Sequence, residues 1–257
     1  RMNKLLTKPL IYDQLLPLGK IGTPVDYIFQ DDLGLARPYK LYIFLNAFHV
    51  TAQQRAMIER LPKKGAKAFL WIYAPGYAGK TLDVQGCRDL TGLHISTIEM
   101  ESPLQVKNTP KGAQMLPGVK EGIMYGSPTD GEKPDPSIPD ISGKYFYGED
   151  LSADLPGVLW GKGTVIGPLF YGDDPSADVL GILYGHDLPG LITKDINGLQ
   201  VYYSAAPTLS SAVIRGIAAR AGVHIYNACD DSLYANKSFL AVHTAESGIR
   251  TLTFPKK

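Results

Sequence analysis

The chain has 257 residues, of which 44% are hydrophobic and 20% are charged, so it can bury a sizeable core and is not globally disordered. Its 26 basic and 25 acidic side chains give a formal net charge of +1, which argues against nucleic-acid binding because that requires a concentrated basic face. No run of about 18 apolar residues occurs, so no membrane-spanning segment is predicted.

The first part of the chain predicts a helix followed by alternating strands and helices. A leucine-rich segment from Asn3 to Gly19 is expected to form a helix that starts near Pro9, because proline is tolerated in the first helical turn. The elements expected next are strand 25–29, strand 39–46, helix 51–60 capped by Thr51, strand 68–73 and strand 93–100. The β-α-β steps in this range imply a parallel sheet with right-handed crossovers.

Two features lead us to expect a fragment of a longer chain. Parallel α/β units normally open on a strand, whereas the first element expected here is a helix. The first residue is also an arginine, Arg1, so the lack of a visible leader is uninformative. We expect residues 1–257 to form a single α/β domain.

Residues 102–163 differ from the rest of the sequence. Prolines and glycines are frequent and no helical period survives, so we expect an insertion of loops and hairpins, including one near residues 144–147. Residues 164–198 then predict antiparallel strands, with apolar runs at 163–171, 178–184 and 190–194. Asn197-Gly198 is a strong signal for a tight hairpin turn.

The stretch from Leu199 to His243 is a compact strand-helix-strand unit. Val201-Tyr202-Tyr203 predicts a strand, because β-branched and aromatic residues suit a half-buried pleated surface. Hydroxyl side chains between Thr208 and Ser211 can cap a helix that ends at Gly222. Further strands are expected at 224–226, 239–242 and 249–254.

Ligand sites in parallel α/β proteins form at the carboxyl ends of the strands. The best-placed candidate for a catalytic site is the turn after strand 68–73. Its residues include Ala74, Pro75 and Tyr77 but no serine or cysteine that could act as a nucleophile. A plain strand end is therefore the simpler interpretation of this turn. The two cysteines, Cys87 and Cys229, form no spaced metal motif, and the sequence alone does not decide whether they pair.

A candidate cleft would combine five residues from different parts of the chain, namely His49, Tyr77, Asp173, His243 and Glu246. Such side chains could act as general acids, bases or hydrogen-bond partners if the fold brought them within reach of one another. Each of these residues is explained equally well by an ordinary structural role in a loop or at the end of a strand. Zinc-ligand spacing, a phosphate loop and a twelve-residue calcium loop are all missing from the sequence, so no cofactor or metal is predicted.

Two acidic doublets, Asp173-Asp174 and Asp230-Asp231, raise the question of glycoside hydrolysis, which uses two carboxylates across one gap. Adjacent residues of an extended chain point to opposite sides, so neither doublet forms such a pair by itself. Both doublets are more simply turn and cap residues.

The segment PYKLYIFLNAFHVTAQQRAMIERLPKKGAKAFLWIYAPGY resembles the first half of the trimerisation domain of family 42 beta-galactosidases. LHISTIE is similar to the next strand of that domain, and VYYSAAPTLSSAVIRGIAARAGVHIY to its closing strand-helix-strand. The family's usual first strand is not found before Asn3. The resemblance implies a flavodoxin-like, class I glutamine-amidotransferase-like α/β fold, a three-layer sandwich around a mostly parallel sheet, that has lost the amidotransferase nucleophile.

The resemblance implies a non-catalytic role, since in that family hydrolysis belongs to a separate barrel domain. We expect a homo-oligomer or contacts with neighbouring domains of a parent protein, a link to carbohydrate, and no nucleic-acid or membrane partner. A parent that degrades polysaccharide would be periplasmic or secreted. The aromatic residues at 145–147, Trp160 and Tyr171 could form a sugar or subunit surface, and Phe170 is expected in the core. The alternatives are a hydrolase that uses the candidate cleft, or a small-molecule module at the strand ends.

Overall fold

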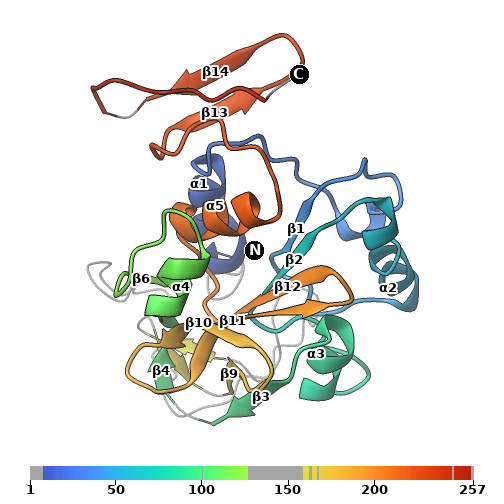
Figure 1. Cartoon of the computed structure of the whole chain (residues 1–257). Helices are drawn as coiled ribbons and strands as arrows, with labels where there is room; N and C mark the ends of the chain where they lie inside the picture. The colour runs from blue at the N-terminus through green and yellow to red at the C-terminus, as the bar shows by residue number, and fades with distance from the viewer. Residues whose placement is uncertain are drawn as a thin grey trace.

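The computed structural model describes residues 8–99, 101–126, 159–161, 164–166, 168–244 and 246–255. A curled seven-stranded sheet lies at the centre of Figure 1. Its strands, in spatial order, are β1 (Leu41–Phe44), β2 (Ala68–Ile72), β12 (Leu199–Ser204), β11 (Pro189–Ile196), β10 (Asp178–Leu183), β5 (Gln105–Asn108) and β6 (Met124–Gly126). The smaller sheets are β13 (Ser232–Ala235) with β14 (Leu240–His243), β3 (Ile95–Ile98) with β9 (Leu169–Gly172), and β4 (Glu101–Pro103) with β8 (Thr164–Ile166) and β7 (Leu159–Gly161).

The helices of the described chain are short. They are the π-helix η1 (Lys8–Tyr12), α1 (Asp13–Gly19), η2 (Gln30–Asp32), α2 (Ala52–Ile58), η3 (Pro62–Lys64), α3 (Val84–Thr91), α4 (Pro110–Met115) and α5 (Ser211–Arg220). Among the described residues, no helix has both the length and the apolar character needed to cross a bilayer.

The main sheet is mixed, which corrects the prediction of a mostly parallel sheet. β1 runs parallel to β2 and β2 runs parallel to β12, as the apolar runs in those regions predict. From β12 to β6, every neighbouring pair is antiparallel. Short turns join β10 to β11 and β11 to β12, and strands joined by a tight turn pair antiparallel. The antiparallel strands predicted after residue 163 are therefore confirmed, and β10 and β11 extend the main sheet.

The N-terminal helix forms as predicted, but the strand predicted at 25–29 is absent. η1 and α1 together span Lys8–Gly19, in agreement with a start near Pro9. Val25–Phe29 carries strand-forming residues, yet no described strand pairs with it. β1 is consequently an edge strand, and its residues alternate between half-buried and buried instead of being buried on both faces.

Local sequence signals account for α2 and β2. The Thr51 hydroxyl accepts a hydrogen bond from the Gln54 amide (3.2 Å), and the Gln54 side chain accepts one from the Thr51 amide (2.8 Å). This reciprocal capping box starts α2 where the sequence predicts it. β2 is buried at every position, as expected for a strand with neighbours on both sides.

Part of the expected insertion at 102–163 pairs with the main sheet, and the helix α4 (Pro110–Met115) lies where loops and hairpins were predicted. β5 pairs with β10, and α4 follows β5. The Thr109 hydroxyl caps α4 by accepting a hydrogen bond from the Gly112 amide (3.0 Å). A helix of six residues is too short to show a helical period, so the pattern does not reveal it. Residues 127–158, with the hairpin expected near 144–147, lie outside the described part of the chain.

The Asn197-Gly198 turn and the helix of the Leu199–His243 stretch are confirmed. Asn197 and Gly198, with φ of 55° and 82°, form the tight turn between β11 and β12. Ser210 caps α5, and Gly222, with φ of 74°, follows the end of that helix.

The C-terminal strands are only partly as predicted. The run at 239–242 forms β14, which pairs with β13 in a ribbon at the top of Figure 1, apart from the main sheet. The strands predicted at 224–226 and 249–254 are absent. One backbone hydrogen bond joins these two segments, from the Thr253 amide to the Tyr226 carbonyl (2.9 Å), and a single bond does not make a ladder.

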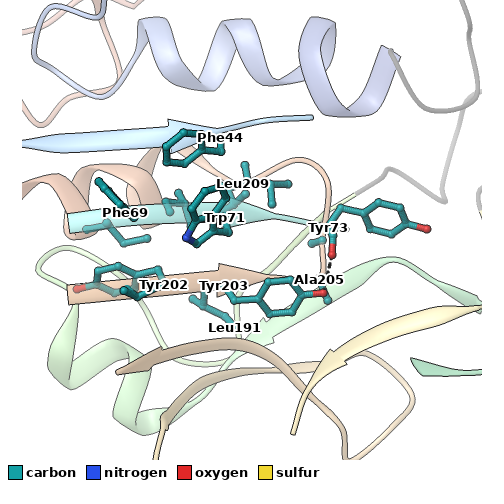
Figure 2. Close-up of a cluster of buried hydrophobic side chains, with 14 of the residues drawn as sticks. Phe44, Phe69, Trp71, Tyr73, Leu191, Tyr202, Tyr203, Ala205 and Leu209 are labelled. Carbon is teal, nitrogen blue, oxygen red and sulfur yellow. Dashed lines mark hydrogen bonds between the residues drawn. The ribbon is translucent and has the colours of Figure 1, made fainter. Parts of the chain in front are cut away.

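The core centres on aromatic side chains of β1, β2 and β12. Trp71 stacks on Phe44 with ring centroids 3.9 Å apart, and Tyr202 and Tyr203 are fully buried beside them (Figure 2). Phe170 of β9 is also fully buried, which confirms the expectation that it is a core residue. Buried rings of this size dominate core energetics, so this cluster holds the parallel half of the sheet together.

Candidate functional site

The carboxyl ends of the parallel strands are packed with apolar residues. Tyr73 and Ala74 follow β2, Ala205 and Ala206 follow β12, and all four are buried. The Tyr73 amide donates to the carbonyl of Ser204 (2.8 Å), which ties the two strand ends together. The part of the fold where α/β proteins place their ligands is therefore filled by the protein's own side chains.

Tyr73 occupies a strained position at the end of β2. Its φ is +68°, a left-handed conformation that bulky residues rarely adopt. Its carbonyl accepts a hydrogen bond from the Tyr203 hydroxyl (2.7 Å; Figure 2), and Phe48 and Phe170 pack against its ring. Burial raises the pKa of Tyr73 well above its usual range, so its hydroxyl stays protonated. A strained strand-to-turn residue is the geometry of a nucleophile elbow, but the side chain here is no nucleophile.

His49 and Tyr77, two residues of the candidate cleft, lie near each other beside this turn. The Nδ1 atom of His49 lies 2.7 Å from the carbonyl oxygen of Ala78, and the Ala78 amide donates to the Phe48 carbonyl (2.9 Å). The Tyr77 ring meets Phe170 edge to face, with centroids 4.9 Å apart. These contacts fasten the turn after β2 to the loop after β1. The sequence places Tyr73 at the end of the buried strand before this turn but does not reveal its strained backbone.

Asp173 has a different set of neighbours. Its carboxylate accepts a hydrogen bond from the Ser96 hydroxyl (2.9 Å), and Nδ1 of His94 lies 3.7 Å away. The side chain of the adjacent Asp174 is almost fully buried and pairs with Lys194 (3.0 Å). The two carboxylates pair with different side chains, Ser96 and Lys194, as their adjacency on an extended chain predicts, and both lie beside His94, whose backbone amide donates to Asp174 (3.2 Å).

We expect Asp174 to make the fold sensitive to acid. Burial acts to raise the pKa of Asp174, but hydrogen bonds from Ser176, Lys194 and backbone amides outweigh it and lower the pKa to about 2. The ionised carboxylate therefore stabilises the fold above about pH 4, and this stabilisation is lost as the pH falls toward 2. The melting temperature of Asp174→Asn, followed by circular dichroism, should fall less on acidification than that of the native chain. Asp173→Asn is the control, and an identical acid slope in both variants would contradict the prediction.

His243 and Glu246 lie on and after the β13-β14 ribbon. Both are exposed, and the guanidinium of Arg250 donates to the Glu246 backbone carbonyl (2.9 Å). In Figure 1 the ribbon lies away from α2, the helix that His49 precedes. Among the described residues, the five members of the candidate cleft are thus spread over different parts of the fold. No group of three or more His, Cys, Asp and Glu side chains is placed to hold a metal ion in that part of the chain.

The two cysteines are free thiols in contrasting environments, with Cys87 buried on α3 and Cys229 exposed. Burial raises the pKa of Cys87 to about 12, and only a thiolate reacts readily. We expect Cys229 alone to react with Ellman's reagent in the native chain, and both thiols to react in denaturant. Cys229→Ser should then show no fast-reacting thiol. Two fast thiols in the native chain would mean that Cys87 is accessible, contrary to its burial.

A groove of about 530 Å³ runs along β1, a volume in the range of ligand and peptide sites. One side is Lys40–Ala47, which contains β1, and the other side is Thr23–Gln30. Leu18, Ile21 and Ala218 also line it. We call this feature the edge groove, because β1 is the outermost strand on this side of the sheet.

Polar and aromatic side chains gather around the edge groove. The Tyr39 hydroxyl donates to the Asp26 carboxylate (2.6 Å), and Arg37 pairs with the same carboxylate. These hydrogen bonds, first that of Tyr39 and then that of Arg37, lower the pKa of Asp26. Tyr27 and Phe29 are 60% and 82% exposed. Large exposed aromatic rings beside an apolar hollow are typical of an interaction site.

Aromatic contacts link the groove lining to the C-terminal segment. His224 lines it, the Tyr226 ring meets His224 edge to face (4.6 Å), and Phe254 meets Tyr226 (6.1 Å). Sequence reasoning missed this site because Val25–Phe29 has the composition of a paired strand. The available signal was the set of aromatic and charged residues between Asp26 and Tyr39, because a buried strand does not require such residues around it.

No protein-family model and no curated protein matches the sequence. Among solved structures, the chain is similar to a beta-galactosidase from Bacillus circulans sp. alkalophilus, with a TM-score of 0.52 and 14% identity over 91% of this chain and 31% of that one. The chain shares its fold with part of a beta-galactosidase. A catalytic mutant of a family 42 beta-galactosidase from G. stearothermophilus also matches, with a TM-score of 0.47 and 14% identity over 82% of this chain and 25% of that one.

This similarity supports the coarser part of the family resemblance. At 14% identity it establishes the fold alone, and it is consistent with a domain of such enzymes. The chain spans 31% of the length of the Bacillus enzyme. The activity of that whole protein therefore does not transfer directly to this chain.

Proposed function

We propose that this chain is a non-catalytic domain of a glycoside-hydrolase-related protein, equivalent to the trimerisation domain of family 42 beta-galactosidases, and that it makes contacts with other subunits or domains. The exposed apolar surface around the edge groove carries this proposal. Tyr27 and Phe29 are 60% and 82% exposed beside the groove, and Tyr234 of β13 is a further 71% exposed aromatic ring. Large exposed aromatic rings beside an apolar groove mark an interaction site.

The ends of the parallel strands support the non-catalytic part of the proposal. In this view β1, β2 and β12 form a flavodoxin-like, amidotransferase-like unit, to which the antiparallel strands are added. A buried tyrosine, Tyr73, then stands at the elbow where an amidotransferase would carry its nucleophile. A carbohydrate site of the parent would lie in another domain and be shaped by contact with this one.

Light scattering coupled to size-exclusion chromatography tests the proposal. We expect the native chain to associate at micromolar concentrations, and the double variant Tyr27→Ser, Phe29→Ser to be shifted toward the monomer. Tyr184→Ser is the matched control, because Tyr184 is also exposed (48%) but does not line the edge groove. A strict monomer at all concentrations would count against assembly. Release of nitrophenol from an aryl galactoside by this chain alone would favour the hydrolase alternative instead.

A further inference from the structure

β1 uses only half of its backbone groups to pair with β2. In a parallel pair, alternate residues of each strand direct their N–H and C=O groups toward the neighbour. The Lys40 carbonyl accepts from the Ala68 amide (2.9 Å), so the even-numbered residues face β2 and Leu41, Ile43 and Leu45 face away from it. No described backbone group bonds to these three residues on that side. The edge groove is therefore lined by a row of available donors and acceptors.

The other side of the groove is also free for pairing. Within the described chain, no backbone hydrogen bond involves Val25–Ile28, and the next one along is from the Asp32 amide to the Phe29 carbonyl (2.9 Å). Phe29 has an extended backbone, with φ of −68° and ψ of 148°. A strand placed between this segment and β1 would find hydrogen-bonding partners on both sides.

The chemistry of the groove favours an uncharged polypeptide strand over a sugar. Most of its lining residues are apolar, and the charged and imidazole groups around it are already engaged with the protein. Asp26 pairs with Arg37, the Lys40 ammonium donates to the Gly222 carbonyl (2.5 Å), and Nε2 of His224 lies 2.7 Å from the Thr253 carbonyl. A sugar needs several convergent polar groups, whereas a strand needs backbone partners and apolar contacts.

The order of elements fits a strand at this place. Leu18 of α1 lines the groove, and the chain passes from α1 into Val25–Ile28, which lines it as well. In α/β folds, a strand-helix-strand unit places its two strands in one sheet with the helix packed over them. A strand in the groove would complete such a unit with α1 and Val25–Ile28.

We propose that the edge groove takes one added β-strand, an extended and uncharged segment with apolar side chains at alternate positions, supplied by a neighbouring domain of the parent protein. This inference rests on the proposed function and names the partner of that surface. Since the chain spans 31% of the beta-galactosidase that it resembles in fold, the rest of a comparable parent would offer the polypeptide for such a strand. The added strand pairs with Leu41, Ile43 and Leu45 and lengthens the parallel half of the sheet.

Amide exchange measured by NMR tests this inference. The probe is the β12 sequence LQVYYS, which is uncharged and forms a parallel strand in this protein, fused to the amino end of the chain through Gly-Ser linkers of graded length. The fusion should slow exchange at the amides of Leu41, Ile43 and Leu45 at least tenfold. The amides of Tyr42 and Phe44, which face β2, should be unaffected and serve as the internal reference.

The control fusion carries proline in place of the valine of LQVYYS and should give no protection, because proline lacks the amide donor. Unchanged exchange with every LQVYYS fusion overturns the proposal. A tethered strand should have a millimolar effective concentration at the groove. If the free LQVYYS peptide at micromolar concentration protects these amides equally well, the proposal that the strand comes from a neighbouring domain is overturned. Protection by galactose or lactose instead of the strand makes the groove a sugar site. Amide exchange does not depend on the oligomeric state that light scattering measures. The exchange result can therefore contradict this inference while the proposed function stands, and the light-scattering result can contradict the proposed function by itself.

Discussion

Replacing Trp71 by alanine should destabilise the fold by about 3–5 kcal/mol, the range for large-to-small changes at buried aromatic residues. Trp71 is 1% exposed, lies on β2 between β1 and β12, and stacks on Phe44 at 3.9 Å. Neighbours on both sides are held in ladders, so they cannot move in to fill the cavity. Urea unfolding followed by circular dichroism measures the loss as a lower midpoint at unchanged slope.

Two further variants sharpen this test. The indole Nε1 of Trp71 is buried, and no described group accepts a hydrogen bond from it. Trp71→Phe keeps most of the ring contact and removes that unpaired donor, so it should cost much less than Trp71→Ala. Phe29→Ala, at a site 82% exposed, should change the free energy of unfolding by less than about 0.5 kcal/mol. Equal losses for Trp71→Ala and Phe29→Ala would mean that the aromatic cluster does not hold the sheet.

The sequence predicts the elements whose cause is local. The Thr51 capping box, the Asn197-Gly198 turn and the continuous apolar run of β2 each depend on residues within a few positions of one another. The same holds for the cap of α5 at Ser210. In these places the structure and the sequence pattern agree to within a residue or two.

Long-range pairing decides the remainder of the fold. Val25–Phe29 and the segment 249–254 have strand composition, but a strand requires a partner, and the sequence does not say whether one is present. β5 joins the main sheet through β10, some 70 residues later in the chain, and no local pattern encodes that pairing. The mostly parallel sheet was predicted from the β-α-β steps and the family resemblance, and no local pattern shows that the antiparallel strands β10 and β11 join the same sheet.

The candidate site likewise divides into features with a local cause, which the sequence predicts, and features that depend on long-range pairing, which it does not. Sequence reasoning could exclude a nucleophile at the turn after β2 from residue types alone. It could not find the edge groove. Lys40–Ala47 and Thr23–Gln30 line this groove because no described strand lies between the two segments, and a local sequence pattern does not show that such a strand is missing. Nor could it identify the tertiary role of Gln14, which occupies one polar position in a leucine-rich helix.

Gln14 should be as sensitive to substitution as a core aromatic residue. It is fully buried, its side-chain amide donates to the Leu209 carbonyl (3.0 Å), and its side-chain carbonyl accepts from the Leu209 amide (2.7 Å). This pair of bonds ties α1 to the segment that leads into α5. Gln14→Leu keeps the size of the side chain but leaves both backbone groups of Leu209 buried without partners, at about 1–3 kcal/mol each.

We therefore expect Gln14→Leu to lower the free energy of unfolding by about 2–6 kcal/mol in urea titrations. Gln53→Leu makes the same chemical change at an exposed position of α2 and should stay within about 0.5 kcal/mol of the native chain. A native-like Gln14→Leu would show that α1 shifts to let solvent reach Leu209. Because Leu18 of α1 lines the edge groove, such a shift would also widen the groove, and faster amide exchange at Leu41 and Ile43 would report it.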